Sequence, residues 1–373
     1  MAEREGFEPS IRFWRILTFQ ASAFDHSATA PQRFAWKGCA VSRLVLARKP
    51  DMAALRARPG WGRLSGMITL FLPLLLAQAA AAQSAGRTAP DARSPAEIVA
   101  AASPDQWSSI TAEDLIVMDL ATDARGRARR VVIQLMPPPF GQGWIANIRT
   151  LARARWWDGT SVNRVQDNYV AQWGDATEKK VLPAGLGKVP ESGYVARLDR
   201  VKGNGYYPGR SQDPYDGLPQ FLMGWPTMFD LGTDAIWPVH CYAAVGVGRN
   251  LSPDTGTGAE LYTVIGHAPR HLDRNIAVVG RVIEGIEHLS SLPRGTEALG
   301  FYKTAAERTP IRSIRLASDL PAAERPRFQY LSTESVSFAR YADARANRRD
   351  AFFIRPAGGA DICNVPVPVR REP

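Results

Sequence analysis

The spacing of apolar residues in the region after position 115 predicts two β-strands followed by a helix. Residues 115–120 and 130–136 are apolar runs of strand length with turn-forming residues at 123–126 between them, so they predict a β-hairpin. Apolar side chains then recur at helical spacing, at Trp144, Ile145, Ile148, Leu151 and Ala152. Because polar residues occupy the opposite side, residues 141–155 predict an amphipathic helix.

A second hairpin follows directly. Residues 160–165 are rich in β-branched and small side chains, Asp167 and Asn168 supply a turn, and residues 169–173 alternate large and small side chains. Arg164 lies on the first of these strands and Gln172 on the second. The hairpin therefore brings a guanidinium and a carboxamide over the same patch of sheet.

The remaining pattern extends this β-rich body in both directions. Further runs of strand length lie at 241–247, 261–265 and 309–316. Residues 284–292 predict a helix, and residues 83–113 predict a flexible leader with one short helix. Residues 176–239 combine many glycines, prolines and aromatics without a sustained period, so we expect an ordered, irregular insertion that packs on the strands. Residues 319–373 form a C-terminal appendage, with a helix expected at 340–349.

The first 82 residues follow a different pattern. Residues 52–82 have the three parts of a secretory signal peptide: a basic start with three arginines, an apolar run at 67–77 and three alanines at 80–82. The run is shorter than the roughly 20 residues of a membrane-spanning helix, so we expect cleavage, export to the periplasm and no stable membrane insertion. Residues 1–51 show neither the helical nor the strand periodicity of apolar residues. We expect a mis-assigned start, with Met52 as the initiator.

Composition changes the picture once this segment is set aside. The whole chain has a net charge of +10, but residues 83–373 hold 35 Lys and Arg against 31 Asp and Glu, a net charge of +4. Basic runs are short and are typical of solvated faces. The charge therefore gives no reason to expect a nucleic-acid partner.

Two cysteines remain after residue 82, Cys241 and Cys363. An even number in an exported protein permits a disulfide, which would contribute about 4 kcal/mol in the chain-entropy model. Spacing alone does not test the geometry of such a bond, so a disulfide and two buried thiols both stay open.

The second hairpin resembles the signature of the cyclophilin-type peptidyl-prolyl isomerases. That signature reads Tyr/Trp-x-Gly-x-x-Phe-His-Arg-Ile/Val, then Phe-x-x-Gln-Gly-Gly-Asp-x-Thr. The matching positions are Trp157, Gly159, Arg164, Val165, Gln172, Gly174, Asp175 and Thr177. Two later segments also resemble the family, around Pro253-Asp254-Thr255 and from Leu272 to the strand at 278–282.

The resemblance implies a mainly β fold: a closed, antiparallel, eight-stranded cyclophilin-like barrel over residues 114–318, with two capping helices. The insertion at 176–239 and the appendage at 319–373 are additions to it. The implied activity is isomerisation of X-Pro bonds in proline-containing polypeptides, with no cofactor and no metal. Arg164 would act on the twisted amide and Gln172 would orient the neighbouring backbone. The implied substrate-binding residues are Tyr169, Val170, Glu260, Tyr262, His271 and Leu272.

Several positions depart from the family pattern. Asn163 replaces the signature His, and Glu260 stands where the family has its second Gln. His271 and Ile276 replace the usual Trp and His. These departures favour a second hypothesis, a cyclophilin-like module of the periplasm that binds peptides or a partner without useful catalysis. An intact Arg164 and an intact Gln172 favour the isomerase, and the oligomeric state stays open.

Overall fold

The computed structural model describes residues 92–201, 205–206, 213–215 and 217–373. The expected mis-assigned start and signal peptide lie outside the described residues. Among the described helices, none combines the length and the apolar character that crossing a membrane requires.

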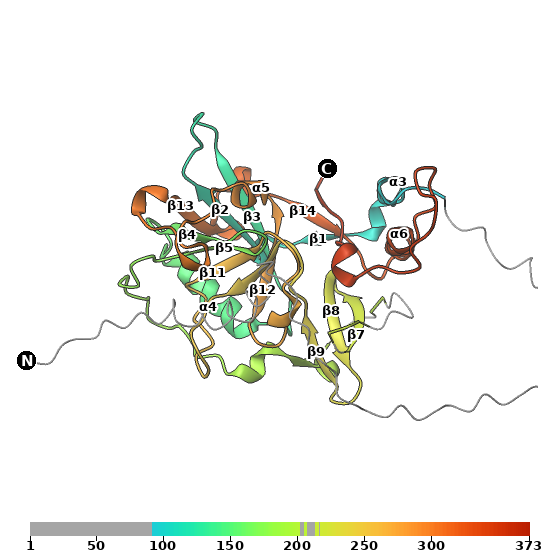
Figure 1. The fold of residues 1–373 in the computed structure, drawn as a ribbon, viewed down its shortest axis with the longest axis horizontal. Coiled ribbons are helices and arrows are strands. Elements are labelled where there is room, and N and C mark those ends of the chain that lie inside the picture. Colours follow the sequence, from blue (N-terminus) through green and yellow to red (C-terminus); the bar gives the residue numbers. More distant parts are fainter. Residues whose placement is uncertain (1–91, 202–204, 207–212, 216) are drawn as a thin grey trace, which may run out of the picture. The chain divides into compact units, whose positions relative to one another are not determined.

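A closed barrel of eight antiparallel strands forms the body of the described chain (Figure 1). Its strands, in the order in which they pair, are β10 (Ala244–Val247), β11 (Leu261–Val264), β5 (Val170–Gly174), β4 (Ser161–Val165), β13 (Thr309–Leu316), β2 (Leu115–Leu120), β3 (Arg129–Leu135) and β12 (Val278–Glu284), which pairs back to β10. The predicted eight-stranded antiparallel barrel is confirmed. Seven of these strands fall on runs that the sequence pattern had indicated, and β12 falls on the segment that the family resemblance had indicated.

Two helices accompany the barrel. The first, α4 (Gln142–Arg153), buries Trp144, Ile145, Ile148 and Leu151 in the barrel core, as its amphipathic spacing predicts. The second, α5 (Glu287–Ser290), is shorter than the expected 284–292. Its start is delayed because Glu284 still pairs within β12, and Gly285 then turns the chain with a positive φ.

Residues 176–239 contain a four-stranded antiparallel sheet that the sequence pattern did not indicate. Its order is β6 (Ala196–Arg197), β9 (Ala235–Pro238), β8 (Trp225–Asp230) and β7 (Leu218–Leu222). One face contributes Leu222, Trp225, Phe229 and Ile236 to the barrel core, and the other contributes Phe221, Met228 and Trp237 to a second apolar cluster. Because both faces are buried, the strands show no polar alternation that would reveal them.

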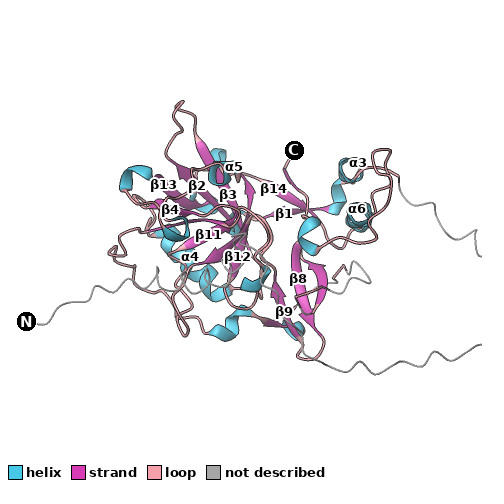
Figure 2. Ribbon diagram, viewed as in Figure 1, coloured by secondary structure: helices cyan, strands magenta, loops and turns pink. Residues whose placement is uncertain are grey.

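The second cluster joins the two ends of the described chain. A three-stranded sheet pairs β1 (Trp107–Ile110) with β14 (Phe328–Leu331) and β14 with β15 (Val369–Arg371). Beside it, α3 (Pro95–Ala100) packs on α6 (Val336–Ala346), and the few helices of the fold are visible around the strands in Figure 2. A capping box between Ser94 and Glu97 starts α3.

A disulfide fastens this terminal region to the barrel side. Cys241 precedes β10 and is bonded to Cys363, which lies 122 residues later. The bond closes a long loop, so it restricts the unfolded chain more than a short-range link does.

Candidate active site

The register of four barrel strands places the key side chains in one row. Arg164 on β4 lies opposite Gln172 on β5, Gln172 lies opposite Tyr262 on β11, and Tyr262 lies opposite Gly246 on β10. A Cβ at Gly246 would collide with the phenol of Tyr262, so only glycine lets that ring lie across β10. The hairpin therefore brings Arg164 and Gln172 together as the sequence predicts.

The guanidinium of Arg164 lies among oxygen acceptors. Its Nε donates to the carbonyl of Leu299 at 2.8 Å, its Nη1 donates to Oε1 of Gln172 at 3.1 Å, and its Nη2 donates to Oε1 of Gln166. None of these acceptors is charged, and Arg164 is 0% exposed. Burial lowers the pKa of Arg164 to about 10, so the side chain remains a cation at neutral pH.

A segment from residue 295 to 302 covers this guanidinium. It runs along the part of β4 that β13 leaves unpaired: the amide of Gly295 donates to the carbonyl of Val165, and the amide of Tyr302 donates to that of Asn163. The ring of Phe301 lies 5.5 Å from the guanidinium carbon of Arg164. In this conformation the segment, here called the cover, shuts Arg164 off from solvent.

The predicted substrate-binding residues divide by exposure. Val170, Tyr262 and Leu272 are buried, Tyr169 and Glu260 are partly buried, and His271 is exposed. Tyr169 joins two parts of the site, because its ring lies 5.6 Å from the guanidinium carbon of Arg164 and stacks at 6.3 Å on the imidazole of His271. Burial raises the pKa of Tyr169 to about 12, and partial desolvation of the His271 imidazole lowers its pKa although the residue as a whole is exposed, so both are neutral at pH 7.

Gln172 connects Arg164 to an acidic residue. Its Oε1 accepts from Arg164, while its Nε2 donates to Oε2 of Glu260 at 3.4 Å, so the orientation of the amide is fixed from both sides. Burial raises the pKa of Glu260 to about 7, against the opposing effect of hydrogen bonds from Gln172 and Asn163. Glu260 is therefore poised to change charge near neutral pH.

A hollow of about 320 Å³ opens beside this pair. Its walls include Gln172, Glu260, Trp156, Lys180 and Arg249. A polypeptide that approaches Gln172 from solvent has room here, and the wall offers groups of both charge signs.

A series of buried polar side chains that no sequence motif indicated lies behind Tyr262. The phenol of Tyr262 lies 2.9 Å from Nε2 of His240, and Nδ1 of His240 lies 2.8 Å from Oδ1 of Asp273. Asp273 also accepts from Nε of Arg270 at 2.7 Å, and Arg270 is paired with Asp213. Because the carboxylate of Asp273 needs a donor, we assign the imidazole proton to Nδ1, which leaves Nε2 to accept from Tyr262.

These polar side chains could not be predicted as a group from the sequence, because they are spread over residues 213–273 and match no motif of fixed spacing. Within this polar chain, His240 holds the phenol of Tyr262 in the row. Within the described residues, no group of three or more His, Cys, Asp or Glu side chains is placed to hold a metal ion.

Comparisons with known proteins identify the domain. Residues 143–316 match the family model described as "Cyclophilin type peptidyl-prolyl cis-trans isomerase/CLD". Among solved structures, the cyclophilin AquaCyp293 from Hirschia baltica is similar at 21% identity and a TM-score of 0.56, covering 71% of this chain and 93% of that one. At that identity, the likeness concerns the fold.

A second solved structure is more distant. A cyclophilin-type peptidyl-prolyl cis-trans isomerase of Cryptosporidium parvum, in the presence of the dipeptide Ala-Pro, has 11% identity and a TM-score of 0.32, covering 54% of this chain and 98% of that one. A search of the curated proteins finds no match.

Proposed function

Because residues 143–316 form a cyclophilin-type peptidyl-prolyl cis-trans isomerase domain, we propose that this protein isomerises X-Pro bonds of exported polypeptides through Arg164. The observation that carries the proposal is the hydrogen bond from Arg164 to Gln172 across β4 and β5 of that domain. It pairs the two residues whose positions match the family signature.

The chemistry asks little of the protein. The barrier to rotation is the roughly 18–20 kcal/mol of amide resonance, and it falls when conjugation is lost. A guanidinium N–H that donates to the prolyl nitrogen stabilises the twisted amide, because the nitrogen lone pair is available only in that state. A thousandfold acceleration needs about 4 kcal/mol, which a charged donor in a desolvated site can supply.

The cover must withdraw before substrate reaches Arg164. In the closed state the carbonyl of Leu299 accepts from Nε of Arg164. On our proposal this carbonyl stands in for the substrate carbonyl, which takes over the same donor when the cover leaves. The hydrogen bond from Nη1 of Arg164 to Oε1 of Gln172 meanwhile remains and keeps the guanidinium in place. The observed rate then depends on the fraction of molecules in which the cover is open.

Two features support an exported location for this activity. Residues 52–82 carry the pattern of a cleaved signal peptide, and the bond between Cys241 and Cys363 belongs to oxidising compartments such as the periplasm. The proposed substrates are accordingly proline-containing segments of exported proteins during folding.

A second candidate function is a peptide-binding module without useful catalysis. The complete burial of Arg164 favours it, as do Asn163, Glu260 and His271 at positions where the family has other residues. Such a module would take peptides in the hollow beside Gln172 and leave the cover closed.

A protease-coupled assay on a short X-Pro peptide separates the two candidates. We expect the Arg164→Ala variant to lose about a hundredfold in kcat/KM, the scale typical of one lost transition-state donor. Arg130→Ala is the matched control, because Arg130 is an arginine of the barrel wall paired with Asp119 on the surface, and it should retain full activity. Background rates in both wild type and Arg164→Ala would reject the isomerase, and peptide binding retained by both would then support the module.

A further inference from the structure

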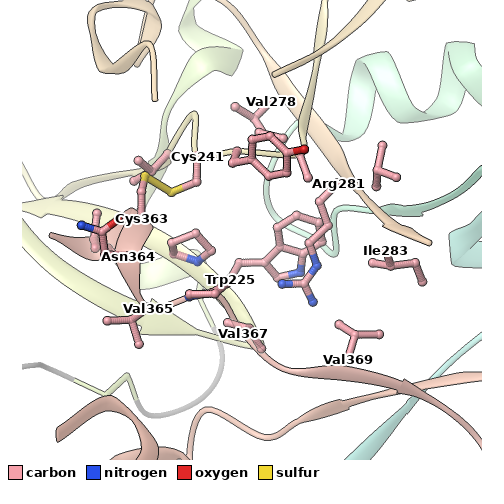
Figure 3. A pocket seen from close by; sticks show the side chains of 18 of the residues that line it. Trp225, Cys241, Val278, Arg281, Ile283, Cys363, Asn364, Val365, Val367 and Val369 are labelled. Carbon is pink, nitrogen blue, oxygen red and sulfur yellow. A yellow bond between two sulfur atoms is a disulfide. The ribbon is translucent and has the colours of Figure 1, made fainter. Parts of the chain in front are cut away.

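A second cavity lies away from the Arg164 row, between the barrel, the insertion sheet and the C-terminal segment (Figure 3). Its volume is about 400 Å³, within the usual range of small-molecule sites. The walls are mainly apolar. Val278 and Val282 come from β12, Trp225 comes from β8, and Val365 and Val367 come from the C-terminal segment.

The charged residues of the cavity wall have one sign. Arg281 and Arg345 line it, and its lining residues include no aspartate or glutamate. Arg281 is half-buried and Arg345 is exposed, and no carboxylate lines the space, so its potential is positive and favours an anionic ligand.

Arg281 is the more informative of the two. Its Nε donates to Oε1 of Gln134 at 2.9 Å and its Nη1 donates to the carbonyl of Gly224 at 2.8 Å, and both acceptors are uncharged. Figure 3 shows its guanidinium beside the indole of Trp225, where the guanidinium carbon lies 4.4 Å from the ring centroid. The Nη2 atom is buried and has no hydrogen-bond partner within the described residues.

This arrangement is costly without a ligand. Burial lowers the pKa of Arg281 only to about 10, so the group keeps its charge at neutral pH. No carboxylate of the described residues forms an ion pair with it. Arg281 is half-buried as a whole, but its Nη2 is buried with an unused N–H, so it lacks the anion that would compensate for the desolvation of that group.

We propose that the cavity binds an aliphatic carboxylate. The carboxylate accepts from Nη2 of Arg281, and the hydrocarbon chain lies along the valines and Trp225. The bond between Cys241 and Cys363, which also lines the cavity, holds the C-terminal wall in position before the ligand arrives. A monoanion with an apolar chain suits a site where Nη2 of Arg281 is available and the walls are mainly apolar.

Titration calorimetry with decanoate tests the proposal on the whole protein. We expect one decanoate per chain, and dissociation constants that fall roughly fourfold per methylene from octanoate to decanoate, as expected for hydrocarbon transfer. Decanol has the same chain without the charge and should bind at least tenfold more weakly. Absence of decanoate binding, or equal binding of decanol, would overturn the proposal.

Two variants locate the site. Arg281→Met keeps an unbranched side chain but removes the charge and should weaken decanoate binding at least tenfold, whereas Arg130→Met, a surface arginine of β3, should leave it unchanged. Val369→Trp fills the cavity from a half-buried position and should block binding while Arg281 is intact. If Arg281→Met does not fold, Val369→Trp decides. Unchanged binding in Val369→Trp would place decanoate elsewhere and refute the site.

Discussion

Glu260 is the residue whose protonation should change the stability of the active-site wall. It lies against the amide of Gln172 and lines the hollow of about 320 Å³. Burial raises its pKa to about 7 from the ordinary value of 4.5. We therefore expect Glu260→Gln, which supplies the residue of the family signature, to stabilise the folded protein at pH 8 and to change little at pH 4.

The direction follows from which state holds the proton. Below pH 4.5 Glu260 is protonated in both the folded and the unfolded chain. Between pH 4.5 and about 7 the unfolded chain has released the proton while the folded chain retains it, so folding stability falls by roughly 1.4 kcal/mol per pH unit.

The full shift amounts to roughly 3 kcal/mol, and we reduce this to about 2 kcal/mol because the hollow admits water to the carboxylate. A glutamine has no such dependence on pH. The difference in unfolding free energy between variant and wild type should accordingly grow from near zero at pH 4 to about 2 kcal/mol at pH 8.

Urea unfolding followed by tryptophan fluorescence between pH 4 and pH 8 measures this difference directly. Glu191→Gln serves as the control, because Glu191 is an exposed glutamate of the insertion, and its difference from wild type should not vary with pH. A constant difference for Glu260→Gln across the range, or a less stable variant at pH 8, would refute the reasoning.

Three further perturbations probe other features. Phe301→Ala removes a ring from the cover and should raise kcat/KM in the prolyl peptide assay by about tenfold, the scale of a desolvated cation–π contact; an unchanged rate would mean that the cover does not limit access. Asp273→Asn weakens the hydrogen bond to the buried imidazole of His240 and should lower the unfolding free energy, measured in urea, by about 2 kcal/mol. A decrease below about 0.5 kcal/mol would contradict this role of Asp273. Replacing Cys241 and Cys363 together by serine should lower stability by about 4 kcal/mol, so equal unfolding midpoints would contradict the loop-entropy argument.

The barrel was predictable because its strands carry their own local signal. The runs at 115–120 and 309–316 correspond residue for residue to β2 and β13, and the helical spacing from Trp144 onward correctly places α4. The strand β13 and the helix α4 each bury one face against the core, so their sequences repeat with the period of the element, whereas β2 is buried on both faces and was indicated by a continuous apolar run of strand length.

The features that were missed depend on contacts between distant residues. The insertion sheet is buried on both faces, which removes the alternation of apolar and polar residues. The cover over Arg164 carries no sequence motif, and only the unpaired edge of β4 explains why the segment lies there. The partnership of His240 with Asp273 likewise arises from the fold rather than from spacing.

The insertion sheet depends on the C-terminal segment for the burial of one of its faces. Removing residues 319–373 would expose Phe221, Met228 and Trp237 to solvent and create an apolar surface patch. A trimmed barrel would aggregate or recruit a substitute covering, so a minimal catalytic fragment is not available by simple truncation. The insertion and the C-terminal appendage bury each other's apolar faces, so they must fold together with the barrel.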